Sequence, residues 1–207
     1  MKRTFVVAEA ACCHDGDLSR AVELVNVAKR AGADAVKFQW CSSSRRMAER
    51  RRVAGDPYRL LAFPPHWLDY LREAALHLGL EFMCTVYLPE DVPAAARYVS
   101  RFKVASLEAT DWHFLAMHAA YDDRPVYVST GTLDLREVDV AVAGYRRSGL
   151  TGGGSQNPRL LHCVSVYPCP LEQANLGVLR NQPFGQGLAR YEGLSDHTRH
   201  PWTGALA

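Results

Sequence analysis

The sequence predicts an α/β protein with the fold of a TIM (β/α)8-type barrel, incomplete as given and containing about seven βα units. Short apolar runs alternate with amphipathic stretches along the chain, and the connections between them are short. This alternation requires parallel strands, because each crossover helix returns the chain to the same end of the sheet. The runs are apolar on both faces, as strands buried between helices or inside a barrel must be.

The position of the polar residues decides between a barrel and an open doubly wound sheet, because both folds fit the alternation. Polar side chains fall at or after the carboxyl end of nearly every predicted strand, from Glu9 in the first to His197 after the last. In a barrel these ends meet at one face, whereas an open sheet spreads them along an edge. The sequence therefore favours the barrel.

Each expected strand is a run of β-branched and apolar residues, such as TFVVAE or EFMCTV. In chain order the expected strands are residues 4–9, 34–39, 81–86, 101–106, 124–130, 158–165 and 189–195. The expected helices have apolar residues at helical spacing, as in LSRAVELVNVAKRAG. In chain order they cover residues 18–32, 65–79, 89–100, 112–122 and 135–149, with an irregular helical stretch near 170–181 and a first helical turn in the final WTGALA.

The segment SSSRRMAERRRVAGDP, residues 42–57, is expected to be a polar loop because it has no apolar periodicity. Five arginines lie in it. We interpret it as a mobile, solvated lid or insertion. The alternative is a surface that recognises an acceptor with negative charge. A nucleic-acid surface is disfavoured because no aromatic residues lie between the arginines.

Composition limits the class of protein. With 207 residues, of which 48% are hydrophobic, the chain is long enough for one large domain with a single core. A net charge of +2 selects neither nucleic acid nor an anionic membrane. The N-terminal apolar run is too short for the hydrophobic region of a secretory signal peptide, and no apolar run in the sequence is long enough to span a bilayer. The six cysteines show no CxxC spacing, so we expect reduced thiols and a cytoplasmic protein.

Seven motifs occur in order at the predicted strands: AEAACCHDGD, GADAVKFQ, GLEFMCT, FKVASLEAT, VYVSTGT, LLHCVSVYPCP and GLSDHT. Together they resemble the N-acetylneuraminate (sialic acid) synthase family over essentially the whole chain. The resemblance implies a TIM-barrel enzyme that condenses phosphoenolpyruvate with an N-acetylated amino sugar, N-acetylmannosamine or a related sugar. The product would be a sialic or nonulosonic acid, with release of phosphate. A divalent metal, Mn2+ or Mg2+, is implied as well.

Phosphoenolpyruvate is a small trianion, so compact cations and directed hydrogen-bond donors suit it. The resemblance implies that the groups holding its phosphate and carboxylate are Lys37, Thr85, Lys103, Ser106, Ser129 and Ser195, with backbone N–H groups near residues 129–131. Glu9 would lie over the reacting carbons. The resemblance adds Glu108 and Tyr167 to the catalytic residues Glu9, Lys37 and Lys103, and it adds Gln39 and Ser165 to the substrate-binding residues. Taken singly, each lysine is also compatible with a surface cation and Glu9 with an ion-pair partner.

His197, in GLSDHT, is the expected metal ligand by the same resemblance. The family takes a second histidine from a Glu-Lys-His-Phe-like motif after the eighth strand, and this chain has no such motif. His162, in HCVSVYP, is expected to hold its loop by a hydrogen bond, and metal ligation by His14 or His162 is the minority alternative. Cys12 and Cys13 are expected to be small buried fillers rather than nucleophiles.

The chain departs from the family pattern at Ala11 and Cys13, where glycine and asparagine are usual, and segment 42–57 lacks an asparagine expected to contact the N-acetyl group. We interpret residues 1–207 as one N-acetylneuraminate synthase-like TIM-barrel domain without the end of the barrel and without an antifreeze-like domain. Two other functions stay open: a catalytically silent binding or scaffold barrel, and another phosphoenolpyruvate-dependent sugar-acid synthase with a phosphorylated acceptor. The expected partners are phosphoenolpyruvate and an amino sugar, with no nucleic acid and no membrane, and a homodimer is compatible with the resemblance.

Overall fold

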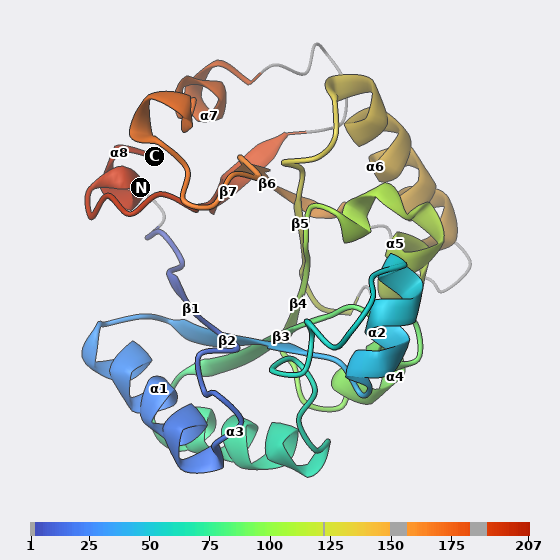
Figure 1. Ribbon diagram of the computed structural model, residues 1–207. Helices are drawn as coiled ribbons and strands as arrows, with labels where there is room; N and C mark the ends of the chain where they lie inside the picture. The colour runs from blue at the N-terminus through green and yellow to red at the C-terminus, as the bar shows by residue number, and fades with distance from the viewer. Residues whose placement is uncertain (1–2, 122, 150–156, 183–189) are drawn as a thin grey trace. The chain divides into compact units, whose positions relative to one another are not determined.

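The structure, a computed structural model, describes residues 3–121, 123–149, 157–182 and 190–207 (Figure 1). Its contacts divide the chain into two compact units, Met1–Phe102 and Lys103–Ala207. Both units alternate strands with helices, and every strand pair described below is parallel. The predicted alternation of strands and helices is therefore confirmed.

The first unit contains three complete strands and the start of a fourth. Its elements are β1 (Val7–Ala11), α1 (Leu18–Arg30), β2 (Ala35–Trp40), α2 (Ser44–Arg51), α3 (His66–His77), β3 (Glu81–Val86), α4 (Asp91–Ala95) and the first residues of β4 (Arg101–Val104). β1 pairs with β2, β2 with β3, and β3 with β4. Neighbours in this part of the sheet are therefore neighbours in the chain, as in a barrel built from consecutive βα units.

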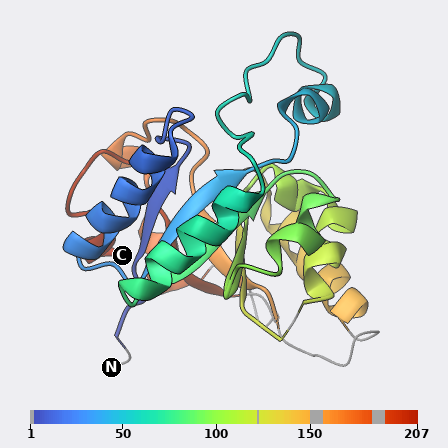
Figure 2. The same cartoon turned by 90° about the horizontal axis from the view of Figure 1, so that it is seen from below.

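The core of the first unit lies between its sheet and two helices. Alternation along β2 sends Val36, Phe38 and Trp40 to one face, where all are buried, and places Lys37 and Gln39 on the other. The helices α1 and α3 lie side by side along the sheet (Figure 2). Each buries an apolar stripe at helical spacing: Ala21, Val25 and Ala28 on α1, and Leu68, Leu71 and Ala75 on α3.

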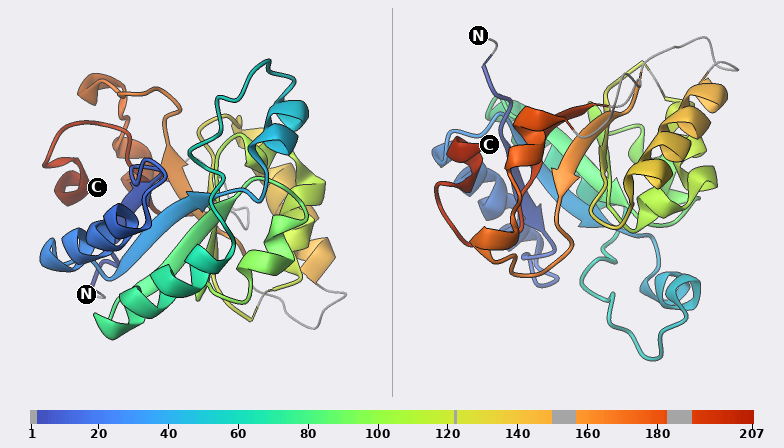
Figure 3. Two further views of the ribbon diagram at one scale, coloured as in Figure 1. Left: turned by 60° about the horizontal axis from the view of Figure 1, so that its bottom comes forward. Right: turned by 90° about the horizontal axis from the view of Figure 1, so that it is seen from above.

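The second unit contains three further strands after the end of β4. Its elements are η1 (Glu108–Thr110), α5 (Trp112–Ala119), β5 (Val126–Ser129), α6 (Leu135–Gly149), β6 (Arg159–Cys163), η2 (Leu171–Gln173), α7 (Gly177–Asn181), β7 (Tyr191–Ser195) and α8 (Thr203–Leu206). β6 pairs with both β5 and β7. The helices α5 and α6 pack against each other (Figure 3), and Phe114 and Val138 are among their buried residues.

The largest departure from the sequence prediction is α2, which lies inside segment 42–57, where a loop was expected. Ser43 caps this helix by accepting a hydrogen bond from the N–H of Arg46 at 3.3 Å, and Met47 and Ala48 are buried beneath it. Arg52 ends the helix with a left-handed backbone, φ 54°. A cap and a short buried stripe can form a helix in a sequence too polar to show apolar periodicity.

Smaller corrections concern element ends. The first strand runs over Val7–Ala11 rather than 4–9, so Glu9 lies in the middle of β1 and not at its end. The helix expected over 89–100 is limited to Asp91–Ala95. The irregular stretch near 170–181 is confirmed as a short 3-10 turn followed by α7. The expected strand 189–195 and helix 112–122 each include a residue outside the described ones.

Candidate functional site

A buried lysine links two neighbouring strands of the first unit. Lys37 on β2 is only 5% exposed, and its Nζ lies 2.5 Å from Glu9 Oε2 on β1. The same ammonium donates a hydrogen bond to Thr85 Oγ1 on β3 at 3.0 Å. We call Glu9, Lys37 and Thr85 the first cluster. Its geometry shows that Lys37 is a buried cation, which excludes the surface-cation alternative for this residue.

Strand register brings the first cluster together. Glu9 lies directly opposite Lys37 in the β1–β2 pair, and Gln39 lies opposite Thr85 in the β2–β3 pair. Residues opposite each other in a parallel pair project from the same face, and so do residues two apart in one strand. Lys37, Gln39, Glu9 and Thr85 therefore share a face. The exposed Glu9 carboxylate also accepts the backbone N–H of Ala11 at 3.1 Å, so Glu9 is both an ion-pair partner and a candidate catalytic group.

Ser106 organises a second group of polar residues in the second unit. Its hydroxyl accepts the backbone N–H of Gly131 at 3.1 Å and donates to Cys163 Sγ at 3.5 Å. Thr132 Oγ1 donates to the carbonyl of Ser106 at 2.6 Å. Lys103, two residues after the start of β4, is 9% exposed and close enough to influence the Cys163 thiol electrostatically. We call Lys103, Ser106, Ser129 and Gly131 the second cluster.

The Ser129 hydroxyl is the strongest candidate in the second cluster for a hydrogen bond to a ligand. The residue ends β5 and is 1% exposed, and its Oγ has no hydrogen-bond partner among the described residues. A buried hydroxyl without a partner costs free energy, so such groups normally meet a water or a bound molecule. The loop that follows is tightly packed, because a Cβ on Gly131 would lie 2.6 Å from Ser165 Oγ and 2.9 Å from the carbonyl oxygen of Cys163. Glycine therefore lets this loop approach β6 closely.

His197 is oriented by a backbone carbonyl. Its Nδ1 lies 2.7 Å from the carbonyl oxygen of Val164, so Nδ1 carries the proton and donates it. In the neutral ring this tautomer leaves Nε2 with its lone pair, which is the form that binds metals. Burial lowers the pKa of His197, but its hydrogen bonds to Cys163 and to the Val164 carbonyl outweigh burial, and the pKa is raised.

Cys163 is the residue that sequence reasoning missed. Its Sγ lies 3.8 Å from His197 Nδ1 and accepts the hydrogen bond from Ser106. Burial raises the pKa of this thiol, but the hydrogen bonds from His197 and Ser106 and the charges of His197 and Lys103 lower it to about 7. The signal available in the sequence was the position of Cys163 at the end of an apolar strand run, directly before predicted site residues.

The remaining predicted residues of the second unit differ in their surroundings. Glu108 is buried in η1, whereas Ser165 is exposed above Gly131. Tyr167 is 74% exposed, and its ring centre lies 4.0 Å from that of His197. Ser195 ends β7, where it pairs in register with Cys163. Tyr167 and Ser195 thus lie beside the His197–Cys163 pair.

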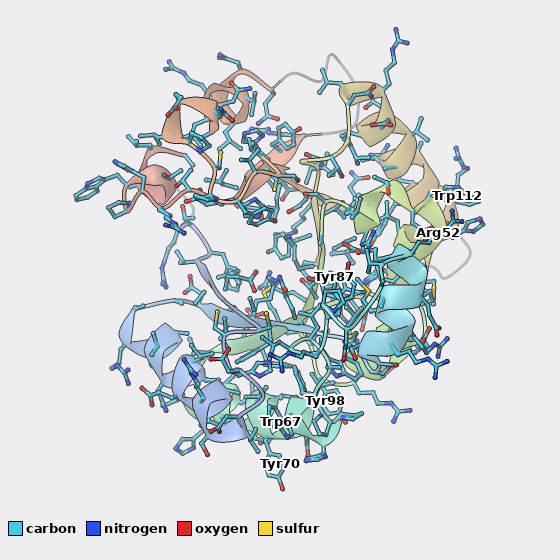
Figure 4. All side chains as sticks on the ribbon, in the orientation of Figure 1. Arg52, Trp67, Tyr70, Tyr87, Tyr98 and Trp112 are labelled. Carbon is cyan, nitrogen blue, oxygen red and sulfur yellow. The ribbon has the colours of Figure 1, made fainter. Side chains whose placement is uncertain are left out.

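His14 and His162 both hold turns by hydrogen bonds, as was expected for His162. His14 Nδ1 accepts the backbone N–H of Gly16 at 3.0 Å, and its buried ring meets Phe63 and Trp67 edge to face. Trp67 lies on α3 (Figure 4). His162 bonds through Nε2 to the carbonyl of Ala174 at 2.8 Å. Each ring therefore fixes a turn.

The cysteine predictions are only partly right. All six cysteines are free thiols, as expected. The expectation that Cys12 and Cys13 are buried fillers is wrong, because Cys12 is half-buried and Cys13 is exposed. The turn after β1 contains left-handed residues at Ala11 and Asp15, φ 50° and 49°, and these reverse the chain outside the core.

The donor set for a metal is small. Within the residues that the structure describes, no group of three or more His, Cys, Asp or Glu side chains is arranged to hold a metal ion. Among the described residues, His197 supplies one nitrogen, Nε2, in the tautomer that can bind a metal. None of the described helices is long and apolar enough to cross a bilayer.

Comparison with known proteins supports the motif analysis. The family model described as "NeuB family" matches residues 24–207. The N,N'-diacetyllegionaminic acid synthase of Legionella pneumophila is 35% identical over 94% of this chain and 57% of its own length. The spore coat polysaccharide biosynthesis protein SpsE of Bacillus subtilis is 30% identical over 95% of this chain and 54% of its own length. The chain thus spans about half the length of these curated relatives.

Solved structures extend the likeness to the fold. The crystal structure of N-acetylneuraminic acid (sialic acid) synthetase from Leptospira borgpetersenii, in complex with citrate, matches with a TM-score of 0.85 and 26% identity, covering 99% of this chain and 69% of that one. The Bacillus subtilis spore coat protein structure matches with a TM-score of 0.78 and 29% identity, covering 95% of this chain and 54% of that one. The predicted α/β fold of the TIM-barrel type is confirmed by these likenesses.

Proposed function

The chain belongs to the NeuB family, as its motifs indicated, and from that premise we propose that it is a phosphoenolpyruvate-dependent sugar-acid synthase. The reaction joins phosphoenolpyruvate to an N-acetylated amino sugar, N-acetylmannosamine or a related sugar, and yields a sialic or nonulosonic acid and phosphate. The observation that carries the proposal is the buried Ser129 hydroxyl, which has no hydrogen-bond partner among the described residues and lies two positions before Gly131, whose N–H donates to Ser106. Six free thiols support the cytoplasm as its compartment.

The second cluster supports binding of the anionic groups of phosphoenolpyruvate. Lys103 supplies a cation that is mostly shielded from water, so its attraction for an anion is stronger than at a surface. Ser129 Oγ supplies a donor, and the Ser106 hydroxyl can turn from Cys163 toward an incoming oxygen. Charge-assisted hydrogen bonds of this kind fix a small anion in one orientation.

The first cluster supports the acid–base and electrostatic part of the reaction. Carbon–carbon bond formation leaves cationic character at the enol ether carbon of phosphoenolpyruvate, and water then adds to that carbon before phosphate leaves. The Glu9 carboxylate can stabilise that charge and accept the proton of the attacking water. The Lys37 ammonium lies 2.5 Å from the Glu9 carboxylate and holds it in position. Thr85 holds the lysine in place through its hydroxyl.

His197 is the residue that would hold a divalent cation. The Val164 carbonyl fixes its tautomer, so Nε2 is available as a ligand without any change in protonation. When bound, such a cation polarises the aldehyde carbonyl of the acceptor. The neighbouring Tyr167 ring packs against the imidazole and limits its rotation.

The proposal is tested by turnover with omissions. Phosphate release and 2-keto acid formation are measured with phosphoenolpyruvate, N-acetylmannosamine and MnCl2 together, and then with each left out. We expect product only in the complete mixture, and loss of product after chelation. In Glu9→Gln the rate should fall by about two orders of magnitude or more. Glu23→Gln on α1 is the matched control, because Glu23 is an exposed ion-pair partner of Arg30.

Three outcomes would contradict the proposal or one of its parts. Phosphate release that does not depend on the sugar would indicate a phosphatase rather than a synthase. Equal rates in Glu9→Gln and the wild type would remove Glu9 from the reaction. Turnover that survives complete chelation would refute the role of a metal at His197 while leaving the condensation in place.

A further inference from the structure

The turn after β1 carries two adjacent cysteines that the proposed reaction does not use. We call Cys12 and Cys13 the thiol pair. Cys13 is exposed and Cys12 is half-buried, whereas the other four cysteines of the chain are all buried. A trans peptide bond joins the two residues, which fixes their Cα atoms about 3.8 Å apart. Of the six cysteines, only these two are therefore both adjacent in the chain and accessible to a reagent.

The backbone connects the thiol pair to the candidate catalytic residue Glu9. The N–H of Ala11, the residue before Cys12, donates to Glu9 Oε1 at 3.1 Å. Ala11 has a left-handed backbone, φ 50°, and the pairing of β1 with β2 shifts its register between Glu9 and Ala11. The N–H of Cys13 donates to the carbonyl of Ala10 at 3.1 Å. A displacement of the thiol pair therefore moves the N–H group that holds the Glu9 carboxylate.

The thiols lie close to each other and to Glu9. Burial raises the pKa of the Cys12 thiol, and Cys13 and Glu9 are near enough for their charges to raise it further. Cys12 is therefore a neutral thiol at neutral pH. Because the thiolate is the form that reacts with oxidants, Cys12 stays reduced and available to a ligand that takes up two thiols.

The spacing of the thiol pair favours a bridging atom over a disulfide. The Cα atoms of unstrained disulfides are about 4.4–6.8 Å apart, so a direct S–S bond between adjacent residues is strained. A larger atom bonded to both sulfurs relaxes this limit. A structural Zn2+ site needs more ligands than two, and the part of the chain that the structure describes has no group of three or more His, Cys, Asp or Glu arranged for a metal. A trivalent arsenical with one organic substituent needs only two thiols.

We propose that the thiol pair is a binding site for trivalent arsenicals, and that a ligand bound there inhibits the reaction by displacing Glu9. The inhibition rests on the proposed function, whereas the binding does not. With phenylarsine oxide, two S–H bonds and the arsenic–oxygen bond break, two arsenic–sulfur bonds form, and the oxygen leaves as water. No atom changes its oxidation state, so the step needs neither an oxidant nor a reductant.

Intact-protein mass spectrometry and turnover assays with phenylarsine oxide test the two parts separately. The wild type, C12S, C13S and C169S are each assayed with and without the arsenical. C169S is the matched control, because it removes a buried thiol and keeps the thiol pair. Excess 2,3-dimercaptopropanol is then added, with 2-mercaptoethanol in parallel, because a dithiol competes for arsenic as a chelate and a monothiol does not.

We expect the wild type and C169S to gain the mass of a single phenylarsenic group, to lose turnover at least roughly tenfold, and to recover only with the dithiol. C12S and C13S should gain no mass, and the arsenical should leave their turnover unchanged. No mass gain in the wild type, or an equal gain in C12S and C13S, would overturn the site. A mass gain with undiminished turnover would overturn the inhibition. If the untreated wild type forms no product, the proposed function is wrong, and mass spectrometry still decides whether the site exists.

Discussion

Replacing Gly131 by alanine probes the close packing around the second cluster. A Cβ at this position would lie 2.6 Å from Ser165 Oγ and 2.9 Å from the carbonyl oxygen of Cys163. The exposed serine side chain can turn away from the new methyl group. The carbonyl cannot, because it belongs to β6, whose Cys163 is paired in register with Ser195 of β7.

The contact between the new Cβ and the Cys163 carbonyl determines how much stability is lost. Ordinary contacts begin near 3.5 Å, so the backbone must move by about half an ångström. Overpacking of this kind costs about 1–3 kcal/mol. A loss of about 2 kcal/mol corresponds to a fall in Tm of roughly 4–8 °C for a protein of this size. The same displacement lengthens the Gly131–Ser106 hydrogen bond, so affinity for phosphoenolpyruvate should fall roughly tenfold as well.

Thermal denaturation and calorimetry of Gly131→Ala measure both effects. Gly144→Ala is the control, because a Cβ at Gly144 in α6 meets nothing within 4 Å. Alanine in a helix interior is about 0.5–1 kcal/mol more favourable than glycine, so the control should melt at or slightly above the wild type. The reasoning is refuted if Gly131→Ala melts like the control and binds phosphoenolpyruvate like the wild type.

Two further predictions concern His118 and Lys37. Burial lowers the pKa of His118 from 6.5 to about 4, so only the unfolded chain takes up its proton between these values. The contribution of His118 to the free energy of unfolding should be complete above pH 6.5 and should fall by about 3 kcal/mol by pH 4. Urea denaturation at a series of pH values should show a free energy of unfolding that depends less on pH in His118→Gln than in the wild type. An equal pH dependence in both proteins would contradict this. Lys37→Met removes the cation that contacts Glu9 and Thr85, so steady-state kinetics should show kcat lowered about ten- to hundredfold. An unchanged kcat would exclude Lys37 from the reaction.

The strands were the most predictable part of the fold, because their apolar runs are short and bounded by turns. The strand at 81–86 and the helix at 135–149 have the predicted ends. The helix α2 could not be found from periodicity, since its stability depends on the Ser43 cap and on two buried residues. The end of β1 was placed too early, at residue 9, because the left-handed backbone at Ala11 that ends this strand is not marked by a glycine in the sequence.

The site was predictable one residue at a time but not as a network. Lys37 stood out because a lysine inside an apolar strand is either buried or paired, and here it is both. The tautomer of His197 and the position of Cys163 depend on contacts between residues more than 30 positions apart. Such contacts leave no trace in local sequence patterns. The buried Ser129 hydroxyl, which has no hydrogen-bond partner in the described part of the chain, is likewise visible only once the packing is known.

The measurement that tests the central claim most directly is calorimetric titration of phosphoenolpyruvate into the wild type and Lys103→Ala. Lys29→Ala is the matched control, because Lys29 lies on α1 and belongs to neither cluster. The account predicts saturable binding by the wild type and by Lys29→Ala, and binding at least roughly tenfold weaker in Lys103→Ala. Equal affinity in all three proteins, or no binding by the wild type, would contradict it.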